Sequence, residues 1–490
     1  MPRALPDPLL SGLGDLLAAR IGLHFPKERW RDLERGVAAA ASAFDMPDAE
    51  ACAHWLLSAP LTHNQIEILA SHLTVGETYF FREKRSFEVI EERVFPELLR
   101  ARERTERRLR IWSAGCCTGE EPYSIAMLLD RLIPRPEEWN VTILATDINP
   151  EFLRKAAEGV YGEWSFRDTP AWLRERYFQR KRAGCFEIDE RLRRRVTFSF
   201  LNLADDVYPS LTNNTNAMDV IFCRNVLMYF TAARARKVIE NLYRSLVDGG
   251  WLIVSPTETS TSLFSRFTAV RFPGVVLYRK LAGAAPRMVV AGYPAPMFGA
   301  QPENLKPPEP AIFPWPVVAD AAGSIPLDAA PSESGRPAAD PGEALASKQG
   351  DPREAPALMA RACANQGKLT EAVEWCERAI AADKLNPANQ YLFAAIQQEL
   401  GQSNAATQSL KRALYLDPDF VLAHFALGNL RLAQGRHREA ERHFDNALTL
   451  LRACPADAVL PESDGLSAGR LVEIIAAVQA SLPRAPKEAA

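Results

Sequence analysis

The sequence predicts an α/β protein of several domains, in which a doubly wound parallel-sheet domain follows an N-terminal helical domain and precedes a C-terminal helical repeat array. Three observations support this prediction. Short apolar runs alternate with amphipathic helical segments over residues 108–280, residues 281–352 hold 14 of the chain's 36 prolines, and small residues then recur every 34 positions. The chain of 490 residues is also too long for a single core, which suggests about two to four domains.

Composition, charge and cysteine spacing narrow the possible functions. The formal net charge is −3, which gives no overall reason to expect nucleic-acid binding. No apolar run approaches the roughly 18 residues needed to span a bilayer, and nothing resembles a signal peptide, so we expect a cytoplasmic protein without membrane insertion. The eight cysteines form no CxxC pair and no Cys/His ligand spacing, and we therefore expect no metal site.

Residues 1–90 show helical patterns separated by polar breaks, without an alternating strand pattern, and we expect the N-terminal helical domain there. Within the segment FPKERWRDLERG, Lys27, Arg31 and Arg35 recur every four residues, so that they share one face of a helix. This face is either a solvated surface or a docking site for an acidic partner, and the local sequence fits both.

The segment 91–282 predicts the doubly wound domain. Near-continuous runs of Val, Ile and Leu, separated by helical segments, indicate parallel strands that are buried on both faces. In chain order the expected elements are LRIWSA, a helix over 120–132, VTILAT, a helix over 150–158, VTFSF, DVIFC, a helix over 231–246, GWLIVS, and a closing pair around FTAVRF and VVLYRK. Ligands of such sheets bind beyond the carboxyl ends of the strands.

Residues 283–352 lack hydrophobic periodicity and are rich in Pro, Ala, Gly and Ser, which is typical of a disordered or semi-extended linker. Beyond the linker, residues 353–454 repeat with the tetratricopeptide (TPR) period of 34, and the recurring small residues allow paired helices to approach closely. These residues are Gly367, Gly401 and Gly435; Ala372, Ala406 and Ala440; and Ala379, Ala413 and Ala447. We expect three all-α TPR units there, followed by a C-terminal helix or tail over 455–490.

The first strand of the α/β domain runs into the sequence IWSAGCCTGEEPYSIAM (111–127). Gly115 and Gly119 permit a sharp turn and a close approach of the backbone to a ligand. Phosphate loops place Lys and Ser or Thr after the second glycine, whereas Glu120 and Glu121 stand here and would repel phosphate. These carboxylates favour a ligand that carries an ammonium or sulfonium charge.

Asp147 ends the second strand, in ILATDINPEFL, where a carboxylate can accept hydrogen bonds from the two hydroxyls of a ribose. Its alternative role is the N-cap of the helix over 150–158. A cationic amino-acid moiety at the first loop and a ribose at the second together describe S-adenosylmethionine. NAD is the rival ligand, but its pyrophosphate would face Glu120 and Glu121.

Two later strands end in polar residues at the same rim of the sheet. FLNLADD (200–206) and DVIFCRNVLMYF (219–230) follow the third and fourth strands, and they place Asn202, Asn225 and Tyr229 at strand ends. The adenine and methionine groups need such amide donors and acceptors. The NPPY or DPPY signature of nucleic-acid amino-methylases is absent from the fourth strand, which weakens base methylation as the reaction.

In order and at similar spacing, several segments resemble the chemotaxis-receptor methyltransferases of the CheR family: LTVGETYFFRE (73–83), WSAGCCTGEEPYSIAM, TDINPEFLRKAAEGVY, NL at 202 and FCRNVLMYF. The resemblance covers roughly residues 10–280 and implies a Rossmann-like, class I S-adenosylmethionine-dependent methyltransferase domain with a small antiparallel β insert. It also implies methyl transfer from S-adenosyl-L-methionine to glutamate side chains of chemoreceptors, with S-adenosyl-L-homocysteine as product. Members with C-terminal TPR repeats are similar to enzymes of Wsp-type and Frz-type sensory systems, and this chain most resembles the Wsp type, which implies biofilm or surface sensing.

The family's cofactor contacts carry over to named positions of this chain. The residues that the resemblance implies are Thr78, Arg82, Glu121, Asp147, Asn202, Leu203, Asn225 and Val226, to which the first-loop argument adds Gly115. Tyr229 matches the tyrosine near the transferred methyl, and Arg82 and Tyr229 are the candidate catalytic residues. The chain departs from the family at Gly76, where the first motif opens with Asn, and neighbouring Glu77 is a candidate replacement.

The absence of histidine between residues 81 and 280 fits this reaction. A glutamate substrate has an ordinary pKa of about 4.3 and is already ionised at pH 7, so no general base is required. Catalysis would then come from positioning and from partial removal of water around the nucleophile. Arg82 holds the incoming carboxylate, holds the cofactor's carboxylate or forms a structural ion pair, while Tyr229 aims the methyl group or the acceptor oxygen.

The resemblance also implies partners. The cytoplasmic domain of a methyl-accepting chemotaxis protein is an acidic helical bundle, which would suit the face formed by Lys27, Arg31 and Arg35. The β insert, over 177–195, is shorter than in members that bind a receptor's C-terminal peptide, and we predict that this chain does not depend on such a tether. The TPR repeats would bind the receptor, another signalling protein or a second copy of the chain.

Two other functions stay open at this point. A repeat-bearing adaptor that binds receptors without catalysis is compatible with the departure at Gly76. An RNA or small-molecule methyltransferase is compatible with the arginines of RARERTERRLR (100–110), although Glu103 and Glu106 among them favour a solvated helix.

Overall fold

The computed structural model describes residues 5–103, 107–181, 184–281, 283, 288–290, 355–456, 458–463 and 466–480. The chain divides into a large unit, Met1–Ala291 with Arg353–Ala490, and a small unit, Gly292–Pro352. The small unit, and with it nearly all of the predicted linker, lies outside the described residues.

The N-terminal region is helical, as the sequence predicts. Its helices are α1 (Asp7–Arg20), α2 (Trp30–Ala43), α3 (Ala49–Ser58) and α4 (His63–Leu73). They share a core in which Leu13, Leu17 and Leu33 are fully buried. The side chains of Asp48 and Thr62 cap α3 and α4, because each accepts a hydrogen bond from an N–H of the first turn that has no partner within its helix.

A mixed, mostly parallel sheet of eight strands forms the centre of the α/β domain. Its strands are β1 (Arg108–Ala114), β2 (Asn140–Asp147), β6 (Val196–Phe200), β7 (Met218–Phe222), β8 (Leu246–Ile253), β9 (Thr268–Phe272), β10 (Val275–Arg279) and β11 (Met288–Val290). The order across the sheet is β11-β9-β10-β8-β7-β1-β2-β6. Pairing is parallel from β6 to β8, whereas β10 runs antiparallel to both β8 and β9. The doubly wound fold that the sequence predicts is thus confirmed.

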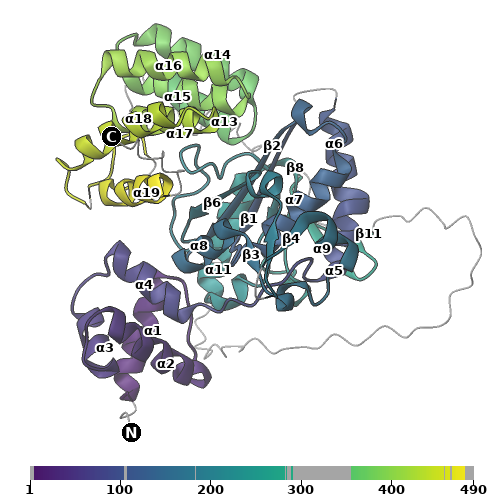
Figure 1. Ribbon diagram of the computed structural model, residues 1–490, viewed down its shortest axis with the longest axis vertical. Coiled ribbons are helices and arrows are strands. Elements are labelled where there is room, and N and C mark those ends of the chain that lie inside the picture. Colours follow the sequence, from purple (N-terminus) through teal and green to yellow (C-terminus); the bar gives the residue numbers. More distant parts are fainter. Residues whose placement is uncertain are drawn as a thin grey trace, which may run out of the picture. The chain divides into compact units, whose positions relative to one another are not determined.

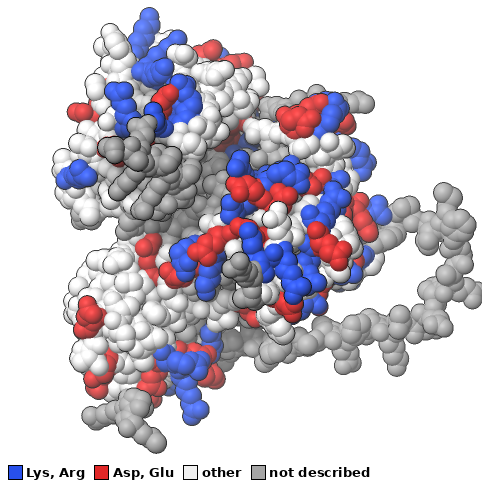
Figure 2. Space-filling view, in the orientation of Figure 1, with Lys and Arg blue, Asp and Glu red and all other residues white. Residues whose placement is uncertain are grey.

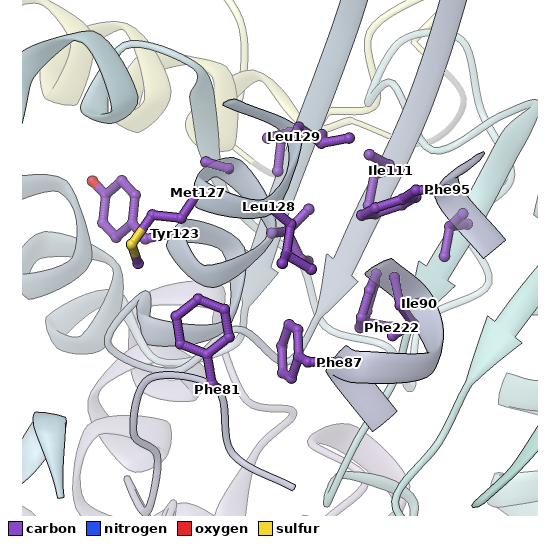
Figure 3. Close-up of a cluster of buried hydrophobic side chains, with 14 of the residues drawn as sticks. Phe81, Phe87, Ile90, Phe95, Ile111, Tyr123, Met127, Leu128, Leu129 and Phe222 are labelled. Carbon is purple, nitrogen blue, oxygen red and sulfur yellow. The ribbon is translucent and has the colours of Figure 1, made fainter. Parts of the chain in front are cut away.

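Helices cover both faces of this sheet, so its strands are apolar on both sides. The helices are α5 (Lys84–Val89), α6 (Phe95–Arg102), α7 (Glu120–Leu132), α8 (Pro150–Glu158) and α11 (Ala232–Ser245). Adjacent residues of β1 show the alternation: Ile111 joins a cluster with Leu128 of α7, and Trp112 joins a second cluster with Leu242 of α11. Figure 3 shows the first cluster, to which the α5 region contributes Phe87.

A small antiparallel sheet packs on the domain, since its residues Tyr161, Phe178 and Phe186 belong to the same buried cluster as Ile111. It contains β3 (Val160–Tyr161), β5 (Phe186–Ile188) and β4 (Phe178–Arg180), in that order, with α9 (Ala171–Tyr177) and α10 (Glu190–Arg193) beside them in sequence. The sequence predicts this insert over 177–195, which contains β4 and β5. The third strand, β3, lies before that range. The sequence does not predict it, because a strand of two residues is too short to show an alternating pattern.

The C-terminal region is an array of antiparallel helix pairs, shown green to yellow in Figure 1. The helices are α13 (Ala355–Asn365), α14 (Leu369–Ala382), α15 (Pro387–Glu399), α16 (Ser403–Leu416), α17 (Val421–Ala433), α18 (His437–Leu451) and the C-terminal α19 (Ala468–Ala480). The repeated glycines have φ between +72° and +76° and end the first helix of each pair. The six repeated alanines are fully buried between the paired helices.

Two features differ from the sequence predictions or extend them. The short strand β11 lies inside the predicted linker and pairs with β9, although its three residues follow a proline-containing stretch without periodicity. Within the described ranges, no helix is both long and apolar enough to cross a membrane.

Candidate active site

The carboxyl ends of β1, β2, β6 and β7 lie along one edge of the sheet, and the loops that follow them carry most of the predicted site residues. The chain winds from β1 toward β2 and β6 on one side, and β7 and β8 lie on the other side of β1. Such a switch in strand order opens a crevice between neighbouring loops, and doubly wound sheets bind their ligands there.

The loop after β1 is a tight turn with left-handed backbone. Gly115 and Gly119 have φ of +82° and +94°, and Cys117 between them has φ of +50°. A Cβ atom on Gly115 would lie 2.4 Å from Cγ2 of Val226, so this position has room only for glycine. Burial raises the pKa values of the Cys116 and Cys117 thiols, which are therefore uncharged side chains packed in the turn.

Asp147 holds this turn from the end of β2. Its Oδ2 accepts a hydrogen bond from the N–H of Cys117 at 2.8 Å, and its Oδ1 accepts one from the N–H of Asn149 at 2.9 Å. Burial raises the pKa of this carboxyl to about 6. The N-cap of α8 is Asn149, whose side chain accepts from the N–H groups of Glu151 and Phe152. The capping role considered for Asp147 is therefore wrong.

Glu120 and Glu121 differ in their surroundings. Glu120 is buried and accepts hydrogen bonds from the hydroxyls of Thr118 and Ser165, at 2.7 Å and 3.0 Å, and its burial raises its pKa. Glu121 forms an ion pair with Arg224 at 2.9 Å. The charge of Glu121 is thus balanced within the protein, whereas the sequence suggests a cationic ligand as its partner.

Asn202 and Leu203 follow β6 and are both buried. The side-chain amide of Asn202 donates to the carbonyl oxygen of Arg20, at the end of α1, at 2.9 Å. Its oxygen accepts from the N–H of Ala204 at 3.0 Å. The amide of Asn202 is therefore engaged within the protein, where it joins this loop to the N-terminal helices.

The loop after β7 also has left-handed backbone, at Asn225, whose φ is +58°. Its N–H donates to Oε2 of Glu258 at 2.6 Å, and its side-chain amide donates to Oγ of Ser255 at 3.0 Å. The second carboxylate oxygen of Glu258 accepts from the N–H of Met228 at 3.1 Å. A single buried carboxylate thus fixes the backbone on either side of Val226.

Tyr229 ends the same loop and is half-buried. Its carbonyl oxygen accepts from the N–H of His24 at 2.8 Å, and the guanidinium of Arg29 lies 5.8 Å from the centre of its ring. Burial raises the pKa of Tyr229, although Arg29 and Arg82 act in the opposite direction. The hydroxyl is therefore protonated at neutral pH and can donate a hydrogen bond.

Thr78 and Arg82 lie in the segment that joins α4 to α5. The segment is anchored to the domain by Phe81, whose N–H donates to Oγ of Ser124 in α7 at 3.0 Å. Arg82 is half-buried, and its guanidinium donates to the carbonyl oxygen of Glu77. Thr78 and Arg82 thus belong to a loop that is fixed at its C-terminal end.

The structure gives a reason for the departure from the family at Gly76. A Cβ atom on Gly76 would lie 2.8 Å from Cζ of Phe152, so a side chain at this position requires the ring of Phe152 to move. Glu77, the candidate replacement, instead forms an ion pair with Arg167.

The predicted docking face is only partly helical. Lys27 lies in a 3₁₀ turn, Lys27–Arg29, and α2 begins at Trp30, so the prediction that Lys27 shares a helical face with Arg31 and Arg35 is wrong. Pro26 precedes this turn, and Nζ of Lys27 lies 5.5 Å from the centre of the Trp30 ring. Figure 2 shows basic and acidic side chains mixed over α2.

Sequence reasoning missed several residues that shape the site: Arg29, Glu83, Arg224, Ser255 and Glu258. Arg224 carries the one sequence signal, since it is a charged residue two positions after β7, an apolar strand that ends at Phe222. Ser255 and Glu258 form a capping box in a 3₁₀ turn after β8, but their contact with Asn225 spans 30 or more residues and leaves no local pattern.

Fold and site together define a class. An open parallel sheet with a glycine turn after its first strand and a buried aspartate after its second is the arrangement of the class I S-adenosylmethionine-dependent methyltransferases. The chemistry of the residues fits this cofactor, because a carboxylate at the end of the second strand is the group that accepts hydrogen bonds from ribose hydroxyls in sheets of this type, and Asp147 stands there beside the glycine turn. Among the described residues, no group of three or more His, Cys, Asp and Glu side chains is arranged to hold a metal ion.

Comparison with known proteins identifies the family within this class. Residues 76–274 match the model for the SAM-binding domain of CheR methyltransferases, and residues 388–420 and 423–456 each match a tetratricopeptide repeat. A probable biofilm formation methyltransferase, WspC of Pseudomonas aeruginosa, is 30% identical, covering 87% of this chain and 95% of that protein. Chemotaxis protein methyltransferase 2 of Vibrio cholerae is 35% identical, covering 42% of this chain and 70% of that protein.

The chain belongs to the CheR methyltransferase family, and S-adenosylmethionine is its cofactor. The similarity to WspC extends through the repeats, whereas the match to the Vibrio cholerae protein covers less than half of the chain. The predicted resemblance to TPR-bearing, Wsp-type members is thereby confirmed.

Proposed function

We propose that the chain transfers a methyl group from S-adenosyl-L-methionine to the γ-carboxylate of glutamates in methyl-accepting chemotaxis proteins, which is the adaptation reaction of chemoreceptors. The products are a glutamate methyl ester and S-adenosyl-L-homocysteine. The observation that carries the proposal is the turn Gly115–Gly119 held by Asp147, within a chain that belongs to the CheR family. The proposal places the reaction in the cytoplasm.

The surroundings of the site suit a reaction that moves no proton. The cofactor supplies a methyl group on a positively charged sulfur. A C–O bond forms as the C–S bond breaks, and the substrate carboxylate enters already ionised. The candidate bases near the crevice are engaged elsewhere: Glu121 is paired with Arg224, and Glu120 and Glu258 are buried acceptors of internal hydrogen bonds. The protein's contribution is then to position the carboxylate and to exclude water.

The cofactor-binding and catalytic roles that the sequence suggests are part of this proposal. Asp147 would accept hydrogen bonds from the ribose, while the turn at Gly115 and the loop of Asn225 and Val226 would enclose the remainder of the cofactor. The proposed cofactor contacts further include Thr78, Arg82, Glu121, Asn202 and Leu203. Since the amide of Asn202 is engaged internally, its contact would come from the backbone.

Arg82 and Tyr229 are the proposed catalytic residues. Arg82 carries the positive charge that would attract an incoming carboxylate. Its guanidinium is half-buried, and among the described residues it forms no ion pair with a carboxylate. The protonated hydroxyl of Tyr229 would donate a hydrogen bond to the acceptor oxygen. Too strong a bond to that oxygen would lower its nucleophilicity, so we expect Tyr229 to orient the carboxylate rather than to bind it tightly.

Receptor docking is proposed at the start of α2. Lys27 and Arg31 are exposed. The guanidinium of Arg29, which also pairs with Asp32 at 3.5 Å, lies 5.8 Å from the centre of the Tyr229 ring, so basic side chains extend from the surface to the site. Arg35 contributes less, because Asp32 neutralises it at 2.6 Å. An acidic receptor helix would complete this surface.

Independence from a receptor tail peptide remains part of the proposal. The insert holds β4 and β5, but residues 182–183 of the loop between them lie outside the described residues. Calorimetry with the free tail peptide of a receptor checks this point, since micromolar binding to the purified protein would contradict it.

The decisive experiment is methyl transfer to receptors from the same host. The full chain is incubated with tritiated S-adenosylmethionine and a panel of receptor cytoplasmic fragments. We expect label that is released by mild base, as methyl esters are. The absence of label from every receptor, with S-adenosylhomocysteine still bound in calorimetry, would favour the catalytically impaired TPR adaptor instead.

The RNA methyltransferase alternative loses its main support in the structure. Among the arginines that the structure describes between residues 100 and 110, only Arg100 is exposed without a carboxylate partner: Arg108 and Arg110 are buried in β1, and Arg102 and Arg107 pair with Asp219 and Glu138. Methyl transfer to total RNA serves as the negative control in the receptor assay.

A further inference from the structure

Arg224 is a buried arginine at the end of β7 that none of the proposed catalytic steps uses. Its guanidinium forms ion pairs with Glu83 at 3.0 Å and with Glu121 at 2.9 Å, and its side chain is 2% exposed. The two carboxylates come from different parts of the chain, one from the segment before α5 and the other from the first turn of α7. Bringing one cation and two anions out of water is expensive unless the geometry is held well.

The same guanidinium also binds backbone. It donates to the carbonyl oxygen of Arg82, the candidate catalytic residue. Phe81 and Glu83, on either side of Arg82, both have left-handed backbone, with φ of +57° and +59°. Side-chain-bearing residues adopt this conformation only where their surroundings impose it.

A polar chain connects this clamp to the loop after β7. Oε1 of Glu83 accepts from the hydroxyl of Ser255 at 2.6 Å, and the same hydroxyl oxygen accepts from the amide of Asn225 at 3.0 Å. Asn225 in turn donates its N–H to Glu258. Glu83 is thus shared between the loop that carries Arg82 and the loop that carries Tyr229.

Aromatic side chains pack against the guanidinium of Arg224. The guanidinium of Arg224 lies 5.2 Å from the centre of the Phe87 ring, and that ring packs against Phe81 and Phe222. Figure 3 shows Phe81, Phe87 and Phe222 within the buried cluster. A charge in such surroundings interacts more strongly with its partners than it would in water.

We propose that Arg224 is a positioning residue that, through Glu83, fixes the backbone of Arg82 relative to the loop of Asn225 and Tyr229. It acts on the reaction without touching the substrate, and its ion pairs with Glu83 and Glu121 set the distance between the two candidate catalytic residues. The inference depends on the proposed function in one respect: the reaction whose kcat is measured is the proposed methyl transfer to receptors.

The test compares Arg224→Lys with a matched control, Arg110→Lys. Arg110 is equally buried in the same sheet, but it lies at the amino end of β1, where it bonds Asn214 and Asn216. Lysine keeps the charge at each position and loses the ability to bind three partners at once. The full chain is used, and kcat, KM, the Kd for S-adenosylhomocysteine and Tm are measured for both variants.

We expect Arg224→Lys to lower kcat at least about tenfold, which is about 1.4 kcal/mol in the activation free energy. We expect Arg110→Lys to lower Tm by about as much as Arg224→Lys does, but to keep kcat within about twofold of the wild-type value. Glu83→Gln is a second, milder variant that keeps an oxygen acceptor for Ser255. If the two residues act together, the double variant Arg224→Lys, Glu83→Gln should lower kcat by less than the product of the two single effects.

Equal kcat values for Arg224→Lys and the wild type would overturn the inference, as would additive effects of the Arg224 and Glu83 substitutions. If Arg224→Lys does not fold, Glu83→Gln decides alone, because an unchanged kcat in that variant excludes action through Glu83. A wild type that binds S-adenosylhomocysteine but methylates no receptor would contradict the proposed function, which is a different outcome from either of these.

Discussion

At the scale of single residues, the site depends on backbone conformations that are costly for residues with side chains. Phe81, Glu83, Cys117 and Asn225 have φ between +50° and +59°, and they lie in three of the loops that meet at the carboxyl edge. Each such residue costs about 1 to 3 kcal/mol. The loops are held in place by hydrogen bonds that the N–H groups of Cys117 and Asn225 donate to buried carboxylates, and by one that Arg224 donates to the carbonyl oxygen of Arg82.

Asp147 leads to a prediction about pH. Burial raises its pKa from 3.8 to about 6, and only the ionised form can accept hydrogen bonds from both ribose hydroxyls. We therefore expect the affinity for S-adenosylhomocysteine to fall about tenfold between pH 7 and pH 5, measured by calorimetry. Asp147→Asn should bind weakly at all pH values and show no such slope. Equal wild-type affinity at the two pH values would contradict the assignment.

The same shift has a consequence of opposite sign for stability. Since the folded state holds the proton of Asp147 more tightly than the unfolded chain does, this group's contribution to the free energy of unfolding falls as pH rises from about 4 to about 6. Above that window it is constant. Between pH 4 and 6, binding and stability should thus respond to this group in opposite directions.

Tyr229 provides a second prediction. Tyr229→Phe removes the hydroxyl and keeps the ring that packs near Arg29. We expect kcat for receptor methylation to fall at least about tenfold, with the Kd for S-adenosylhomocysteine within about twofold of the wild type. An unchanged kcat would mean that the hydroxyl has no part in orienting the acceptor.

Sequence patterns indicate the residue types of this site better than their partners. The turn at Gly115 and the aspartate after the second strand follow from local patterns. The partner of Glu121 does not, because Arg224 lies 103 residues away and no periodicity connects the two. Gly76 is similar: the sequence marks it as a departure, but only the packing of Phe152 explains it.

At the scale of elements, the start of α2 is the proposed docking surface. Arg31 is exposed there, whereas Arg35 is already paired with Asp32. We expect Arg31→Glu to raise KM for the receptor about tenfold and to leave kcat unchanged, with a weaker dependence of KM on salt than in the wild type. Arg35→Glu is the matched control and should have a smaller effect. Equal effects of the two substitutions would contradict a local docking surface.

The elements themselves could be predicted where their patterns were long. The helices over 120–132 and 150–158 match α7 and α8, because apolar spacing and the adjoining turns define both ends. The strands β3 and β11 have two and three residues, which is too short for alternation to be recognised. The sequence predicts a helix through Lys27, because a spacing of four residues does not distinguish a helix from the 3₁₀ turn before it.

At the scale of the whole molecule, every proposed catalytic or cofactor-binding residue comes from residues 76–229, and none comes from the repeats. Catalysis should therefore tolerate damage to the array. Gly428 offers a way to test this, since a Cβ atom there would lie 2.4 Å from Cε1 of Phe444 in the paired helix.

We expect Gly428→Val to destabilise the array by about 2 kcal/mol, because the added side chain overpacks the α17–α18 contact. The change is measured as a lower melting temperature of the helical circular dichroism signal. Ala433→Val, at an exposed position near the end of α17, is the control and should have little effect. Methyl transfer to a receptor fragment should continue in both variants, and its loss in Gly428→Val would place the array within the catalytic machinery.

The division of the chain was the most predictable feature at this scale. A period of 34 repeated at three independent positions identifies the array, and an α/β alternation of nearly two hundred residues identifies the sheet domain. The order of the strands across the sheet could not be predicted from the sequence. The sequence pattern does not show that the antiparallel pair β9–β10 and the strand β11 all join the same edge of the sheet, next to β8.

The three-way pairing of Arg224 with Glu83 and Glu121 also constrains how the chain can diverge. A change at one of the three positions leaves an unmatched charge in the interior, which is tolerated poorly. Substitutions there should accordingly occur together during evolution, so that relatives retain the whole triad or exchange all of it. Aligned homologous sequences should show these positions as a covarying group, although two of them lie 103 residues apart in the chain.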